Sequence, residues 1–164
     1  RADQRMTDAR FEDGTEAPLN LIARDAEDLA VLSALAQDAV FPITEMKWDR
    51  RARRFALLLN RFRWEDRAAA EATRRPYERA QALLAVEDVA AVRTQGIDRG
   101  DRGTVLSLLS LAFAPGADGT GVLTLVLAGD GAIALEVEAL EVALRDVTRP
   151  YAAPSRKAPG HPEG

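Results

Sequence analysis

The chain has 164 residues, of which 47% are hydrophobic and 29% are charged, proportions that suit one globular domain and exclude wholesale disorder. It contains no cysteine, which excludes disulfides, thiolate zinc sites, iron–sulfur clusters and cysteine nucleophiles. The net charge of −4 weakens an assignment to the duplex-binding proteins, because most of their domains are basic overall.

The N-terminal segment 1–16 is polar and partly acidic, and we expect it to be a flexible tail. It lacks the apolar stretch of a signal peptide, and no apolar run in the chain approaches the ~18 residues of a membrane span. Met6 is one candidate for the first residue of the native protein, with residues 1–5 upstream of it. We therefore expect a cytoplasmic protein that does not associate with a membrane.

A single α+β domain is predicted over residues 17–149. It begins with a strand inside 17–24, where apolar and polar residues alternate. Asp25 is a suitable N-cap for a helix from about residue 26 to 39, with acidic residues in its first turn. Apolar positions recur at helical spacing through this segment, and Pro42 follows as a stop signal.

The stretch KWDRRARRFALLLNRFRWED, residues 47–66, predicts a β-hairpin with arginines at its turn. Alternating apolar and polar residues indicate strands over 44–49 and 54–64, joined by a turn around 50–53. The apolar phase slips by one residue near Asn60–Arg61. Because such a slip exchanges the two faces of a strand, it predicts a β-bulge at this point.

The middle of the chain is less regular. Residues 66–77 are polar and alanine-rich, which predicts a surface loop with at most a helical turn. Residues 78–95 allow two alternatives, a pair of strands broken at Glu87–Asp88 or one helix over 77–92. The β-branched valines and the absence of one clean helical stripe favour the strands. A turn is predicted at 98–103.

The last third is predicted to be β structure, with a Gly-Asp-Gly hairpin turn at 129–131. A second phase slip at Ala139 predicts a bulge or sharp bend in the final strand. The segment 150–164 is rich in proline, glycine and charge, so we expect a disordered C-terminal tail. The predicted strands cover residues 104–113, 122–128 and 132–147.

Strands 104–113 and 122–128 are apolar on both faces, so each face needs a cover. The helix, closure of the sheet into a barrel, or a second subunit could supply it. A helix of ~14 residues spans only about 21 Å, which favours barrel closure or dimerisation. The predicted fold is α+β, with one principal helix packed on a mostly antiparallel sheet of about seven strands. The sheet is expected to curl into a roll or small barrel, similar in architecture to pleckstrin-homology barrels.

The sequence predicts no catalytic, metal-binding or cofactor-binding residue, and it favours a non-enzymatic protein. The only histidine, His161, lies in the predicted tail, which argues against a Ser–His arrangement. Glu136 and Glu138 share a strand face and could reach one divalent ion. Alternating glutamates are, however, the ordinary mark of a solvated strand face. The glycine-rich segments lack the lysine and the helix of a phosphate-binding loop.

A basic centre is the candidate interaction surface. Residues 45–79 hold eleven basic and six acidic side chains, whereas the segments on either side are net acidic. A surface that recognises phosphates or carboxylates needs such clustered cations. The candidate residues are Arg50, Arg51, Arg53, Arg54, Arg61 and Arg63.

Three interpretations of these arginines stay open. In RNA or single-stranded DNA binding they would contact phosphates while Trp48, Phe62 and Trp64 stack on bases, although these aromatic residues fall at core positions. In a solvated hairpin they would deter edge pairing and form ion pairs with the acidic helix. In a binding or assembly module they would meet an acidic protein partner or a second subunit of a homodimer. This last interpretation leads, with nucleic-acid binding through the hairpin 47–67 as the alternative.

Four phrases of the sequence carry a resemblance to a known family: FALLLNRFRWED, ATRRPYERAQALL, VLSLLSLAF and GDGAIALEVEALEVALRDVTRPYAAPS. They resemble the bacterial family catalogued as domain of unknown function 2948, found mostly in alphaproteobacteria. The resemblance extends from about Phe11 to His161. It implies an intracellular bacterial protein, and it transfers no activity, cofactor or site residue.

Overall fold

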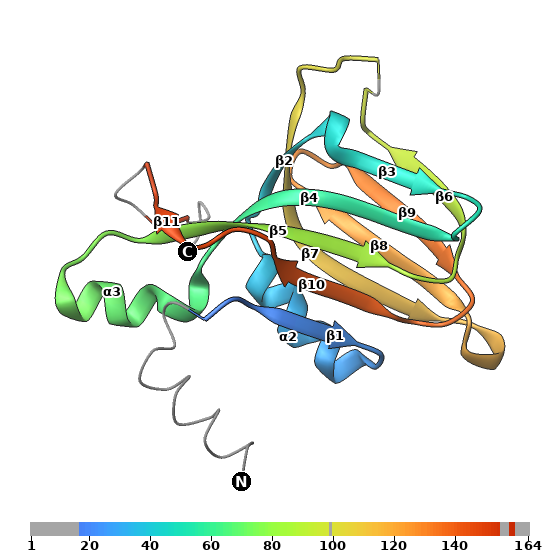
Figure 1. The fold of residues 1–164 in the computed structure, drawn as a ribbon. Helices are drawn as coiled ribbons and strands as arrows, with labels where there is room; N and C mark the ends of the chain where they lie inside the picture. The colour runs from blue at the N-terminus through green and yellow to red at the C-terminus, as the bar shows by residue number, and fades with distance from the viewer. Residues whose placement is uncertain (1–16, 99, 155–157, 160–164) are drawn as a thin grey trace, which may run out of the picture.

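The computed structural model describes residues 17–98, 100–154 and 158–159. Its main feature is a mostly antiparallel sheet of eleven strands that bends into an open roll (Figure 1). The strand order is β1-β10-β5-β4-β2-β7-β8-β9-β6, with β3 paired to β4 and β11 paired to β5. The predicted N-terminal tail 1–16 lies outside the described residues, as does His161 in the predicted C-terminal tail.

The strands are β1 (Asn20–Ala23), β2 (Val40–Pro42), β3 (Met46–Asp49), β4 (Arg54–Phe62), β5 (Glu78–Val86), β6 (Val89–Gln95), β7 (Val105–Pro115), β8 (Gly121–Leu127), β9 (Ala132–Val137), β10 (Val142–Asp146) and β11 (Tyr151–Ala152). Within the described residues the helices are α2 (Ala26–Ala36) and α3 (Arg67–Thr73), with short 3₁₀ turns η1 (Ile43–Glu45), η2 (Trp64–Asp66) and η3 (Ala117–Gly119).

The roll has two layers that enclose one hydrophobic core. The first layer contains β1, β10, β5, β4 and β3, and the second contains β7, β8, β9 and β6. At one corner β5 continues into β6 while β9 continues into β10, and at another β2 pairs with both β4 and β7. Alternate residues of each layer point inward, such as Leu57 and Leu84 in the first and Leu125 and Leu135 in the second, and these four are buried.

Helix α2 covers one open side of the roll, where it packs against β1 and β7 (Figure 1). Its N-cap is the predicted Asp25, whose carboxylate accepts the N–H of Asp28 at 2.8 Å. Leu29 and Leu32 are buried beneath the helix. The hydroxyl of Ser33 accepts the N–H of Leu111 at 2.9 Å, which fixes the helix on β7.

The mostly antiparallel sheet is confirmed, and because it is not closed, the barrel is wrong among the two expected forms. Two other details are also wrong, since the described residues form eleven strands rather than about seven and the protein is mostly β rather than α+β. Strand β2 is too short to show an alternating pattern. The predicted strand 132–147 is two strands, because the chain turns between Val137 and Val142, near the bend predicted at Ala139.

The other local predictions have mixed outcomes. Residues 78–95 form the two strands β5 and β6, whereas the predicted loop 66–77 contains the helix α3. The predicted bulge at Asn60–Arg61 is wrong, because β4 pairs with β5 without a register shift through Phe62. Within the predicted tail 150–164, Tyr151–Ala152 form β11 on β5.

The apolar strands of the second layer are covered on their inner face. Leu123 and Leu125 of β8 are buried in the core, whereas Val122 and Val126 on the outer face stay partly exposed. A second subunit that would cover this outer face, as in the predicted homodimer, stays a prediction. No helix in the described part of the chain is long and apolar enough to cross a membrane.

Candidate binding cleft

The turn between β3 and β4, together with the first residue of β4, carries four exposed arginines, Arg50, Arg51, Arg53 and Arg54, which we call the arginine turn. Arg53 forms an ion pair with Glu138 and Arg54 one with Glu87, each at 2.8 Å. These partners follow β9 and β5, so the ion pairs to the acidic helix that the solvated-hairpin interpretation required do not form. Such exposed pairs contribute little to stability. The hydrogen bond and charge of Glu87 raise the pKa of Arg54.

Arg61 and Arg63, in contrast, lie inside the fold. Their side chains are fully buried, so neither can contact a partner at the surface. Arg61 follows Leu57 and Leu59 on the inward face of β4. A buried guanidinium needs carboxylate partners, because an unpaired charge in the interior is very costly.

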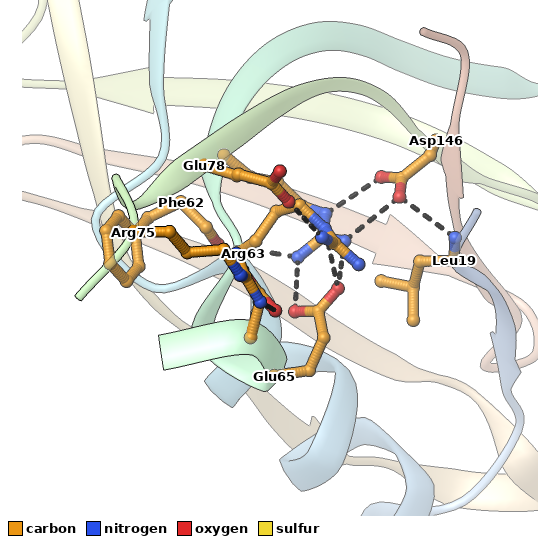
Figure 2. Close-up of polar contacts among 9 residues, drawn as sticks. Leu19, Phe62, Arg63, Glu65, Arg75, Glu78 and Asp146 are labelled. Atoms are coloured by element: carbon orange, nitrogen blue, oxygen red, sulfur yellow. Dashed lines mark hydrogen bonds and ion pairs between the residues drawn. The ribbon is translucent and has the colours of Figure 1, made fainter. Parts of the chain in front are cut away.

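Asp146 and Glu65 provide the partners of Arg61 (Figure 2). Arg61 Nε donates to Asp146 Oδ1 at 2.8 Å and Nη2 donates to Asp146 Oδ2 at 3.0 Å. Its two terminal nitrogens also donate to the Glu65 carboxylate, at 3.0 and 2.6 Å. Asp146 Oδ2 accepts a further hydrogen bond from the N–H of Leu19 at 2.9 Å. These contacts join β4, β10 and the segment before β1.

Three more ion pairs extend the network. Arg63 donates to Glu78 at the start of β5 and lies 3.5 Å from Glu65 (Figure 2). Arg75 donates to both oxygens of the buried Asp66, at 2.7 and 2.6 Å. The network thus pairs the buried charges with carboxylates and joins neighbouring elements. We assign Arg61 and Arg63 a structural role.

The network shifts the ionisation of its members. Burial lowers the pKa of Arg61, but the hydrogen bonds and charges of Glu65 and Asp146 outweigh it and hold the pKa well above its ordinary value. Burial likewise disfavours the Glu65 carboxylate, yet its hydrogen bond with Arg61 prevails and lowers the pKa of Glu65.

We predict that Glu65 makes stability depend on acid. Because its folded pKa is below the ordinary value of about 4.3, its contribution is present above that value and disappears as the pH falls through the folded pKa. Urea unfolding between pH 3 and pH 7 should show a loss of stability below about pH 4 that is smaller in Glu65→Gln. Equal acid dependence in both proteins would contradict this assignment.

Phe62 and Trp64 do not form a stacking platform beside the arginine turn. Phe62 packs edge-on against Trp64, with ring centroids 4.7 Å apart, and against Tyr77 at 5.4 Å. Trp64 Nε1 donates to the carbonyl of Gln37 at 2.9 Å. Trp48 is partly buried and packs against the hydrophobic core, and it also lines a cleft together with Arg50 and Arg53. Phe62 and Trp64 are therefore engaged in packing, whereas Trp48 keeps part of its surface beside the arginine turn.

A cleft of about 800 Å³ lies between β3 and β6, and we call it the edge cleft. Figure 1 shows these two strands side by side on the side of the roll away from α2. Arg50 and Arg53 of the arginine turn line it, and Arg102 from the loop before β7 adds a third cation. The apolar part of the lining comes mainly from Ile43, Met46, Trp48, Phe55, Val89, Ala90, Ala91 and Val92.

The β6 side of the cleft is a free strand edge, since in the described chain β6 pairs with β9 alone. Hydrogen-bonding direction alternates along an antiparallel strand, so one bond fixes the rest. The N–H of Leu127 in β8 donates to the carbonyl of Gly131, the residue just before β9. The backbone groups of Gly131 therefore face β8, and by alternation those of Ala134 face β6. Arg93 lies opposite Ala134, so its backbone groups face β9. Those of Val92 and Thr94 therefore face the free edge.

The β3 side is a free edge by the same argument. The N–H of Arg63 donates to the carbonyl of Glu78, the first residue of β5. By alternation, the backbone groups of the odd-numbered residues of β4 face β5. Ala56 therefore faces β3, where it lies opposite Lys47. The backbone groups of Met46 and Trp48 are then directed away from β4, but the N–H of Met46 already donates to the carbonyl of Ile43. The edge cleft thus meets the backbone groups of Trp48 on the β3 side and those of Val92 and Thr94 on the β6 side.

The sequence identified part of this site. It placed Arg50, Arg51, Arg53 and Arg54 in a turn, and two of them line the edge cleft. It missed the contribution of β6 and of Arg102, because nothing in the sequence indicates that β3 and β6 lie on either side of one gap. One signal of the apolar lining was present in the sequence, because the alternation of Met46 and Trp48 marks an inward face of their strand.

The carboxylates that the sequence singled out do not converge on an ion. Glu136 lies on the outer face of β9 and pairs with Arg93 at 3.3 Å, whereas Glu138 pairs with Arg53. Within the described ranges, no group of three or more histidine, cysteine, aspartate or glutamate side chains could hold a metal ion.

Comparison with known proteins identifies a family. No curated protein and no solved structure matches the chain. The family model described as "Protein of unknown function (DUF2948)" matches residues 19–161, a range that contains every strand from β1 to β11. Because the match covers most of the sequence, the chain belongs to this DUF2948 family.

Proposed function

We propose that the protein is a non-enzymatic binding module whose edge cleft receives an acidic segment of a partner protein. The observation that carries this proposal is the combination, in one cleft, of partly exposed apolar side chains, unpaired strand edges and an arginine-lined rim. Apolar side chains such as Met46, Trp48 and Val92 provide burial for the partner's side chains. The cations favour acidic residues beside them and would accelerate association.

The arginines of the rim are available to a partner to different degrees. Arg50 is exposed and has no ion-pair partner in the described part of the chain, and the same holds for Arg102. Arg53 is already paired with Glu138, so an incoming carboxylate would share or replace that contact. Arg50 and Arg102 are therefore the cations whose removal should affect an acidic ligand most directly.

Nucleic-acid binding is supported less well. It needs several aromatic faces open to bases next to the cations, whereas Phe62 and Trp64 pack against each other and, of the three candidate aromatic residues, Trp48 alone lines the edge cleft. Arg61 and Arg63 are engaged with buried carboxylates. The cations that remain are few, and the chain is acidic overall.

The proposal predicts selective loss of binding on charge reversal at the rim. The purified chain is used to select ligands from a displayed library of random twelve-residue peptides, and the enriched peptides are synthesised. The double variant Arg50→Glu/Arg102→Glu should raise their dissociation constants about tenfold or more. Fluorescence anisotropy over a salt series measures the effect, which should shrink as salt increases.

Arg51→Glu is the matched control, because Arg51 lies in the same turn but does not line the edge cleft. It should weaken peptide binding much less than the double variant. Failure to enrich any acidic peptide would refute the proposed function. The nucleic-acid interpretation would replace the proposed function if a single-stranded RNA or DNA oligonucleotide bound with micromolar affinity and Arg51→Glu weakened that binding as much as the double variant.

A further inference from the structure

We infer that the partner segment binds in an extended conformation, as an additional β-strand hydrogen-bonded to the free edge of β6. This inference rests on the proposed function and specifies how the same cleft recognises its ligand. An extended peptide that joins a sheet gains main-chain hydrogen bonds from the edge, and its alternate side chains enter pockets. The edge cleft offers both features.

The free edge of β6 has the required backbone groups in the required place. Val92 and Thr94 direct their N–H and C=O groups away from β9, as the alternation of hydrogen bonds fixes. Both residues also line the edge cleft. A segment that reaches these backbone groups therefore lies in the cleft itself, against its apolar wall.

β6 is a better docking edge than β3. Proteins protect edges with short strands, lysine and proline, and β3 has four residues that include Lys47. β6 has seven residues and contains neither lysine nor proline. It also ends the path of strands through the sheet. An added strand would extend that path toward β3 and narrow the opening of the roll.

The side chains around the edge define the chemistry of the ligand. Alternate residues of an added strand point to the same face, and on the inner face they would meet Trp48, Met46 and Val92. These positions favour apolar residues. The arginine turn and Arg102 favour acidic residues where the segment leaves the cleft. The expected ligand is an extended acidic peptide with apolar residues at every second position.

The first test changes the backbone of the ligand and leaves the protein intact. Each peptide selected from the library is synthesised as a series with one N-methyl group, which removes a single backbone donor. For strand addition, the loss of affinity should alternate along the peptide, about fivefold or more at every second position and little between them. A flat profile, or losses that follow side-chain size alone, would overturn the inference while leaving the proposed function intact.

The second test changes the β6 edge. Proline is tolerated on an edge strand where its missing N–H would face the free side. Thr94→Pro should therefore weaken peptide binding about tenfold, whereas Thr94→Val, which keeps the N–H, should retain it. Thermal unfolding of both variants checks that the fold is intact. Equal affinity for both variants would contradict pairing at this edge.

Hydrogen exchange provides a measurement without any substitution. In the free protein the amide of Arg93, bonded to β9, should exchange slowly, and those of Val92 and Thr94 should exchange fast. Bound peptide should slow the exchange of Val92 and Thr94 selectively. Unchanged exchange at both amides would refute strand addition. Concentration-dependent protection without peptide, accompanied by a doubled mass, would identify a second copy of the chain as the occupant and overturn the acidic-partner inference.

Discussion

Replacement of Asp146 by alanine should lower the free energy of unfolding by about 3–5 kcal/mol, the usual cost of removing one partner of a buried ion pair. Asp146 accepts two hydrogen bonds from Arg61 and one from the N–H of Leu19. Without the carboxylate, Arg61 stays buried with Glu65 as its one remaining anionic partner. Urea unfolding followed by circular dichroism measures the loss.

Two further variants separate the effect of charge from the effect of packing. Asp146→Asn keeps the shape of the side chain and should still destabilise the protein, because it leaves the Arg61 charge undercompensated. The double variant Arg61→Met/Asp146→Leu removes the buried pair altogether and should be more stable than Asp146→Ala, since apolar replacements of buried pairs are often neutral.

An exposed ion pair provides the matched control. Arg67 and Glu71 are four residues apart on α3 and are both about half exposed, at 3.1 Å. Removal of Glu71 should therefore change stability little. A small loss for Asp146→Ala, similar to that for Glu71→Ala, would show that water reaches Arg61 and that the buried network contributes little to stability.

The network also explains which part of the site could be predicted from the sequence. Alternation identified the hairpin and its turn, because the stretch that contains Arg50, Arg51, Arg53 and Arg54, residues 49–54, is wholly polar except for Ala52. The same reasoning grouped Arg61 and Arg63 with them. It failed there because the carboxylates that bury these two arginines are brought close by the fold, and Asp146 is 85 residues away from Arg61 in the sequence.

Long-range pairing limited the prediction of the fold in the same way. The strands β7, β8 and β9 follow one another and pair in sequence order, so local turn signals predicted them. The two corners of the roll, and the gap between β3 and β6, depend on how distant segments meet. No local pattern encodes that gap, so the edge cleft could be found only in the folded structure.

The phase slip in β4 also has a physical explanation in the fold. A continuous strand with one buried face would keep its apolar phase, and the slip in the sequence therefore predicts a bulge. β4 instead has its end buried on both faces. Arg61 continues the inward face, while Phe62 lies on the other face beneath Trp64 and Tyr77. A charged residue at the inward position hid the regular alternation.

Phe62→Ala should therefore destabilise the protein by about 3–5 kcal/mol, as expected for a fully buried phenylalanine. Its side chain is 1% exposed, and Arg79 lies 6.0 Å above its ring in addition to the two aromatic contacts. The cavity would lie next to Trp64, so the loss should appear both in urea unfolding and in Trp64 fluorescence. A Trp48→Phe background leaves Trp64 as the single tryptophan for that measurement.

Phe113→Ala is the control. Phe113 is only partly buried in the second layer, so its truncation should lower the free energy of unfolding by less than that of Phe62. Two outcomes of the Phe62 variant distinguish the structural explanations. A large loss with a changed Trp64 signal would mean that the aromatic cluster around Phe62 is a second packed unit, joined to the main core through β4. A loss below about 1 kcal/mol would mean that this cluster relaxes independently, since a rigid core cannot absorb a truncation of this size. In that case the ion pairs of Arg61 and Arg63, rather than aromatic packing, would be what holds α3 and the end of β4 in place.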